Sequence, residues 1–235
     1  MALTIHTVLR DEELTLRWLS GSTPRMVVVF TGMRSQVGGQ PLDEFARSAS
    51  LNGQNNVLFV TDRRATWYTA SGLWRRIVRA VTGLRQSEGI REIVSLGTSM
   101  GGYGALLLPR DVRVARAIAL APQITMDRSV LNDLRWPDVG KRWGALPVRS
   151  IADTIEDTRT QYYVSVGGNC PEDVAHLALL PKHKRIHRFV LPRGRHNLAR
   201  SLKDAGVLSD VIAASLRGRK RRVEALYDQY AGVMA

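Results

Sequence analysis

The sequence predicts an α/β fold, and three features of its residue pattern indicate this class. Two short runs, residues 26–30 and 57–60, are continuously apolar, as expected of strands buried on both faces of a sheet. Residues 73–84 instead place apolar side chains at helical spacing, with arginines on the opposite face. A third apolar run, residues 93–96, precedes a glycine-rich turn and then a helix-compatible stretch, residues 103–108. Strands and helices therefore alternate along the chain.

The turn at residues 97–102 reads Gly-Thr-Ser-Met-Gly-Gly and is the most informative stretch. A G-x-S-x-G turn between a strand and a helix is typical of a nucleophile elbow, in which a strained backbone lifts the serine hydroxyl above the sheet. Strand and helix approach closely there, so side chains at Gly97 or Gly101 would collide with them. A glycine-rich loop without chemistry is the alternative, but the flanking elements favour Ser99 as a nucleophile.

Residues 97–105, Gly-Thr-Ser-Met-Gly-Gly-Tyr-Gly-Ala, resemble the α/β-hydrolase family. The resemblance implies a mostly parallel sheet with helices on both faces, and a serine, an acid and a histidine in that chain order. It also implies chemistry that needs neither a metal nor an organic cofactor. We expect a single domain over residues 1–235. Within it, residues 124–160 would form a small cap and residues 218–235 a basic amphipathic C-terminal helix.

The remaining elements follow from shorter patterns. Alternating residues 3–9 and 14–19 predict an antiparallel hairpin at the edge of the sheet. We expect Asp62 to brace the loop after its strand and Trp74 to lie in the core. Further strands are expected at residues 114–120, 162–166 and 186–191, and helices at residues 41–47, 128–134, 150–157 and from about 198.

The resemblance places the acid after the strand at 162–166 and the histidine after the last strand. Asp173 and its neighbour Glu172 both fit the acid position. Asp173 is favoured because it directly precedes a helix-like run, although either carboxylate could instead cap that helix. His196 follows the last strand and is the expected general base. The other histidines fit no such position: His6, His176, His183 and His187.

The oxyanion hole of the family is built from two backbone N–H groups. One comes from the residue after the nucleophile, here Met100. The other comes from the loop after the strand at 26–30, where Met33 is the best candidate and Gly32 the next. Family members often carry a histidine before this glycine, whereas this chain has Thr31.

The formal net charge of +13 favours anionic partners such as nucleic acid, a membrane surface or an acidic substrate. Some of the arginines follow strand ends, where ligands of open α/β sheets bind. They could ring the mouth of the site and favour an anionic ester or a polyanionic glycan. A chain this rich in arginine could equally place some there by chance. These candidate substrate-binding residues are Arg34, Arg63, Arg64, Arg193 and Arg195.

Compartment and partners are indicated by weaker signals. The single cysteine, Cys170, excludes an intramolecular disulfide and a cysteine-rich metal site. No apolar run reaches the ~18 residues of a membrane span, and the N-terminal residues lack the pattern of a secretory signal. We therefore expect a cytoplasmic protein. The basic run at 217–222 could contact nucleic acid or an anionic membrane, or could be the solvated start of the final helix.

Taken together, the pattern predicts a serine hydrolase that cleaves an acyl ester through Ser99, His196 and Asp173. The substrate would be a carboxylic ester, or an acylated carbohydrate or small molecule. Two alternatives remain open. One is an acyltransferase on the same fold, and the other is a non-catalytic protein of this fold that binds an anionic macromolecule.

Overall fold

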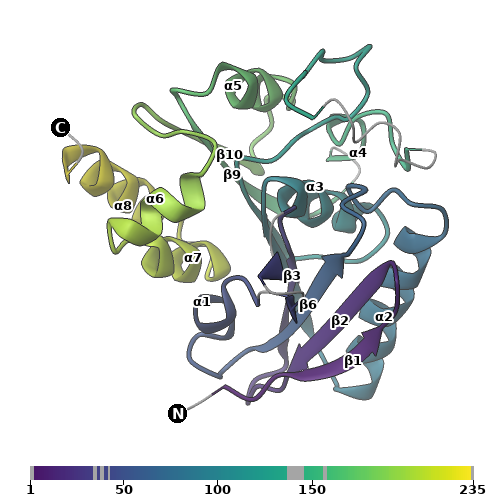
Figure 1. Cartoon of the computed structure of the whole chain (residues 1–235). Helices are drawn as coiled ribbons and strands as arrows, with labels where there is room; N and C mark the ends of the chain where they lie inside the picture. Colours follow the sequence, from purple (N-terminus) through teal and green to yellow (C-terminus); the bar gives the residue numbers. More distant parts are fainter. Residues whose placement is uncertain are drawn as a thin grey trace.

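The computed structural model describes residues 3–33, 36–37, 40–41, 43–136, 146–155 and 158–233. Eight strands of this part form one sheet, in the order β1-β2-β6-β3-β7-β8-β9-β10 (Figure 1). All neighbours from β6 to β10 are parallel, whereas β1 and β2 form an antiparallel hairpin at one edge and β2 pairs antiparallel with β6. The predicted α/β class, mostly parallel sheet and edge hairpin are confirmed.

The element bounds follow the chain order. The strands of the main sheet are β1 His6–Arg10, β2 Leu14–Leu19, β3 Arg25–Phe30, β6 Asn56–Asp62, β7 Glu92–Thr98, β8 Arg116–Leu120, β9 Gln161–Gly167 and β10 Ile186–Leu191. A separate two-stranded ribbon contains β4 Gln36–Val37 and β5 Gln40–Pro41. The helices are α1 Ala46–Ser50, α2 Leu73–Ser87, α3 Met100–Leu107, α4 Ala152–Ile155, α5 Pro171–Ala178, α6 Leu198–Asp204, α7 Leu208–Leu216 and α8 Lys220–Val233, with a 3₁₀ turn η1 at Leu108–Arg110.

Helices cover both faces of the sheet because its central strands are apolar on both faces. In β3, Met26, Val28 and Phe30 point into one core, and Val27 and Val29 point into the other. The first core contains residues of α2, α3, α4 and α5. The second contains residues of α1, α6, α7 and α8, which lie together on one side of the sheet in Figure 1. Trp74 lies in the first core, as predicted.

Two predicted helices differ from the structure. Of the helix predicted at residues 41–47, only Ala46 and Arg47 are helical among the described residues, because Pro41 belongs to β5 and α1 begins at Ala46. Residues 128–134 form a turn and irregular chain, because local side chains bind the backbone there instead. Asp127 accepts from the Ser129 N–H at 2.8 Å, and Asp133 accepts from the Arg135 N–H at 3.0 Å. Such local acceptors compete with helical hydrogen bonds.

The loop after β6 is braced as predicted. The buried Asp62 carboxylate accepts from the Thr66 N–H at 2.6 Å, the Thr66 hydroxyl at 2.8 Å and the Tyr68 N–H at 2.9 Å. Tyr68 in turn donates its hydroxyl to the carbonyl oxygen of Thr31 at 2.7 Å, directly after β3. The polar residue at the end of β6 therefore supports the neighbouring loop at the end of β3.

The parallel strands all end at one edge of the sheet, where β7, β9 and β10 lead into residues 99, 168 and 192. Ligands of open α/β sheets bind at such an edge.

The helix predicted near the C-terminus is α8, which buries Val223, Leu226, Tyr227 and Tyr230. Among the described residues, no helix combines the length and apolar character that crossing a membrane requires.

Candidate active site

Ser99 stands between β7 and α3 with a backbone φ of +52° and ψ of −123°. A non-glycine residue in this region is strained, and surrounding structure must hold it there. The Ser99 N–H donates to the Leu120 carbonyl at 2.9 Å, which ties the turn to β8. On either side, Gly97 and Gly101 allow β7, α3 and the end of β3 to approach with backbone contacts. The predicted sharp turn is therefore present.

The loops after β9 and β10 are joined backbone to backbone. The Gly168 N–H donates to the Leu191 carbonyl at 2.7 Å, and the Asn169 N–H donates to the Gly194 carbonyl at 2.9 Å. A Cβ atom on Gly167 would overlap with the Gly194 backbone. These contacts fix the start of α5 relative to the loop that carries His196.

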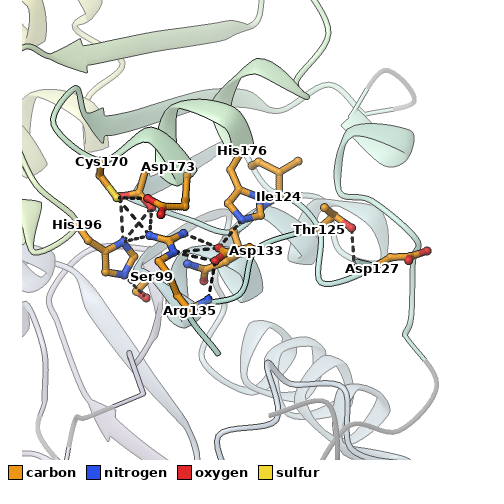
Figure 2. A network of polar contacts seen from close by, with 12 residues as sticks. Ser99, Ile124, Thr125, Asp127, Asp133, Arg135, Cys170, Asp173, His176 and His196 are labelled. Carbon is orange, nitrogen blue, oxygen red and sulfur yellow. Dashed lines mark hydrogen bonds and ion pairs between the residues drawn. The ribbon is translucent and has the colours of Figure 1, made fainter. Parts of the chain in front are cut away.

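Ser99, His196 and Asp173 lie in hydrogen-bonding order, although they are far apart in the sequence (Figure 2). The Ser99 Oγ lies 2.9 Å from Nε2 of His196, and Nδ1 of His196 lies 2.9 and 3.0 Å from the two Asp173 oxygens. Because an ionised carboxylate only accepts, Nδ1 carries the proton and Nε2 is the acceptor for the serine hydroxyl. The arrangement can move a proton from Ser99 to His196.

Asp173 and Glu172 differ sharply in environment. The Asp173 side chain is fully buried, whereas Glu172 is exposed and, within the described residues, accepts from the Cys170 thiol at 3.5 Å. Burial raises the pKa of Asp173, but hydrogen bonds from His196 and Arg135 outweigh it and hold the pKa below its usual value. The structure brings Asp173, and not Glu172, to His196.

Arg135 is a contact that the sequence pattern did not indicate. Its Nη1 atom donates to Asp173 Oδ1 at 2.8 Å and lies 3.4 Å from Nδ1 of His196. Its other guanidinium atoms form a fork on Asp133, with Nη2 at 2.6 Å and Nε at 2.9 and 3.0 Å. Figure 2 shows the guanidinium between the two carboxylates. This segment has no strong periodicity, and the helix expected at residues 128–134 did not indicate the contact.

The chain of contacts continues to His176, which is fully buried. Nδ1 of His176 accepts from the Ile124 N–H at 3.2 Å, so the ring proton lies on Nε2, which donates to Asp133 at 3.1 Å. Hydrogen bonds from His176 and Arg135 overcome the effect of burial and hold the pKa of Asp133 far below its usual value. Asp133 is therefore an ionised carboxylate with a full set of donors.

Cys170, Asp173 and His196 form a cluster whose ligand atoms all lie within 4.8 Å of one another. Such a cluster could bind a cation. In this structure the positively charged guanidinium of Arg135 lies at the cluster. Its Nη1 atom lies 3.3 Å from Cys170 Sγ, in addition to its contacts with Asp173 and His196. Burial raises the pKa of the Cys170 thiol to about 11, so the thiol is neutral.

The loop after β3, which carries the oxyanion candidates, is held by Glu44. The Gly32 N–H donates to Glu44 Oε2 at 3.1 Å, so Met33 is the better of the two predicted donors in this loop. Burial raises the pKa of Glu44 to about 7, against the opposing effect of the Gly32 N–H. Met100, the other predicted donor, is the first residue of α3, where backbone N–H groups have no partner within the helix.

Aromatic side chains form a wall beside His196. The ring centroid of Trp136 lies 5.9 Å from that of His196 and 5.7 Å from that of Trp67. The indole N–H of Trp67 donates to Gln123 Oε1 at 3.0 Å.

Residues 137–145 and 156–157 of the predicted cap lie outside the described residues. The described part of this segment reaches the site through Arg135 and Trp136.

The five predicted substrate-binding arginines fall into three groups. Arg34 lies outside the described residues. Arg63 donates to the backbone oxygen of Asp11, and Arg64 pairs with Glu13 at 3.1 Å, so both are bound to the β1–β2 turn. Arg193 and Arg195 are exposed in the loop that carries His196.

No protein-family model and no curated protein matches this sequence. Among solved structures, the chain is similar to Est1E from Butyrivibrio proteoclasticus, with a TM-score of 0.62 and 13% identity, covering 92% of this chain and 98% of that one. It is also similar to FphF, a fluorophosphonate-binding serine hydrolase of Staphylococcus aureus, with a TM-score of 0.60 and 13% identity over 90% and 98% of the chains. A third is the capsule O-acetyltransferase of Neisseria meningitidis serogroup A, with a TM-score of 0.60 and 14% identity over 86% and 93%.

These likenesses extend over most of each chain and agree with the strand order and the helices on both faces. The protein has the α/β-hydrolase fold, as its elbow motif predicts. At this level of identity the likeness concerns the fold, so the chemistry must be argued from the residues of the site.

Proposed function

We propose that the protein is a serine hydrolase that cleaves an acyl ester. One observation carries the proposal: Ser99, His196 and Asp173 form a continuous hydrogen-bonded line at the carboxyl edge of the sheet, with contacts of 2.9 Å on both sides of His196. The strained backbone of Ser99 is consistent with it, since residues in such conformations cluster at active sites, although other residues of the chain also have positive φ. Esterases and serine hydrolases among the neighbours of the same fold add further support.

In the proposed acylation step, the Ser99 oxygen attacks the carbonyl carbon of the ester. His196 takes the serine proton on Nε2 and passes it to the leaving alcohol. Asp173 holds the imidazole in the required tautomer and stabilises its charged form. The N–H groups of Met100 and Met33 stabilise the negative charge on the carbonyl oxygen. Loss of one such donor costs roughly 3 kcal/mol of barrier in comparable enzymes.

In the second step, an acceptor attacks the acyl-enzyme and regenerates Ser99. Water as acceptor makes the enzyme a hydrolase, and an alcohol makes it an acyltransferase. A neighbour of the same fold is an O-acetyltransferase, so both acceptors belong in the test. Product analysis with p-nitrophenyl acetate, in the presence and absence of glycerol, measures how the acyl group divides between water and alcohol.

Covalent labelling tests the proposal directly. A fluorophosphonate probe should label the wild-type protein at one site, and Ser99→Ala should lose both labelling and ester turnover while keeping its thermal unfolding temperature. Peptide mapping should place the label on Ser99. Labelling of Ser99→Ala at the wild-type rate would contradict the assignment. If the wild-type protein takes no label, the non-catalytic alternative is favoured.

A further inference from the structure

We propose that Arg135 is a positioning residue for this reaction: it holds the Asp173 carboxylate against His196, and it is itself held by Asp133 and His176. The inference rests on the proposed function, because it assigns the group that orients the acid of the proposed triad. The hydrogen-bond geometry of Asp173 and His196 can also be measured without turnover.

The first argument concerns the buried carboxylate. Asp173 is fully buried, and ionised carboxylates in such places need donors to offset the loss of water. Besides His196, Arg135 donates to an Asp173 oxygen, and it is the charged donor there. A carboxylate held by a single histidine could rotate about its Cβ–Cγ bond. The contact to Oδ1 at 2.8 Å fixes that rotation.

The second argument is that helix α5 and the segment before residue 137 are locked at two points. Asp173 and His176 are three residues apart on α5, so they share one face of the helix. Asp133 and Arg135 face them from the segment. The Arg135 guanidinium donates to the Asp173 carboxylate, and the Asp133 carboxylate accepts from His176. Each element therefore supplies one carboxylate and one nitrogen donor. This reciprocal arrangement fixes the distance between the segment and α5.

The third argument concerns charge. A lone guanidinium 3.4 Å from Nδ1 of His196 would oppose formation of the imidazolium during catalysis. The Asp133 carboxylate offsets this, because it forms a fork on the same guanidinium at 2.6–3.0 Å. Charges therefore alternate along the line Asp133, Arg135, Asp173. Arg135 can orient the acid while Asp133 limits its repulsion of the base.

The expected effect of removing Arg135 is on the rate of the chemical step. Arg135→Ala should lower kcat, and the second-order rate of fluorophosphonate labelling, by about 10- to 100-fold, since misplacement of a reacting group by 1 Å can cost about that much. KM should change little. Arg135→Lys should recover only part of the loss, because an ammonium cannot form the fork that spans both carboxylates. Asp133→Asn should reduce the rate less than Arg135→Ala.

Chemical rescue separates positioning from folding. Millimolar guanidinium chloride should restore labelling of Arg135→Ala severalfold, whereas equal concentrations of sodium chloride should not. Arg149→Ala is the matched control, because Arg149 belongs to the following stretch, is 65% exposed and pairs with Asp127 instead. It should label at the wild-type rate. Wild-type rates in Arg135→Ala, or loss in both variants alike, would overturn the proposal.

Two further measurements test the role of Arg135: the rate of an Asp173→Asn, Arg135→Ala double variant and the proton NMR signal of His196. Once Asp173→Asn has removed the charged acid, adding Arg135→Ala should cost little more, so the two losses should be far from additive. The proton NMR signal of the His196 Nδ1–H should shift or broaden in Arg135→Ala and stay in place in Arg149→Ala. This signal needs no turnover. If it responds as expected in a protein that takes no label, the positioning role stands and the proposed function fails; an unchanged signal in folded Arg135→Ala overturns the positioning role.

Discussion

Gly101 lies directly against the carbonyl oxygen of Phe30, so that a Cβ atom on Gly101 would overlap with it. The first turn of α3 therefore packs onto the last residue of β3 without any side chain between them. This contact brings the Ser99 turn next to the loop of Gly32 and Met33, from which one proposed oxyanion donor comes. The glycine of the motif thus positions two parts of the proposed site at once.

Substitution of this glycine should be costly for that reason. Gly101→Ala forces the backbone of Phe30 or α3 to move, and we expect it to lower the free energy of unfolding by about 1–3 kcal/mol or more. Fluorophosphonate labelling should fall below detection even where the protein still folds. Urea unfolding and labelling rates measure both effects. Gly83→Ala in α2 is the control: nothing lies near its Cβ position, and alanine should stabilise the helix by about 0.5–1 kcal/mol.

The acid assignment predicts different outcomes for two neighbouring carboxylates. Asp173→Asn should lower kcat by about 10⁴-fold, as expected when the histidine is held in the wrong tautomer. Glu172→Gln should change kcat little, because Glu172 is exposed and contacts Cys170 instead of His196. Steady-state kinetics with an aryl ester decide between them. A large loss in Glu172→Gln with little change in Asp173→Asn would refute the assignment.

How far the sequence could predict this site depends on where each residue stands relative to a strand. Ser99, Asp173 and His196 follow strand ends, and apolar runs make those ends visible in the sequence. Arg135 and Asp133 lie in a segment without periodicity, where side-chain hydrogen bonds decide the conformation. The helix expected at 128–134 is wrong for the same reason. Such contacts depend on α5 being packed beside the segment, which no local pattern indicates.

Glu44 predicts a pH dependence of stability. Burial raises its pKa to about 7 in the folded protein, from about 4.5 in the unfolded chain. Because the unfolded state loses the proton first, stability should fall as pH rises from about 4.5 to 7 and stay reduced above that range. Glu44→Gln should remove this contribution and stabilise the protein at pH 8 by about 1–3 kcal/mol relative to wild type. Urea unfolding of wild type and Glu44→Gln at pH 5 and pH 8 measures this effect. An equal difference in the free energy of unfolding between the two proteins at both pH values would contradict the prediction.

The exposed arginines beside His196 predict selection of an anionic substrate. Arg193 and Arg195 test this best, because both are exposed in the loop that carries His196, whereas Arg63 and Arg64 lie beside the β1–β2 turn.

If Arg193 and Arg195 attract a negatively charged ester, kcat/KM for that ester should fall as salt rises, because 0.1 M salt screens charges beyond about 10 Å. A neutral ester of equal size should respond little. Reversal of both residues to glutamate should penalise the anionic ester selectively. Reversal of Arg217 is the control, since Arg217 lines a small cavity with Thr23 and Pro24 at the opposite edge of the sheet. If the two esters respond alike to salt, or the control reversal has the same effect, these arginines do not select the substrate, and the positive charge serves solubility or a macromolecular partner.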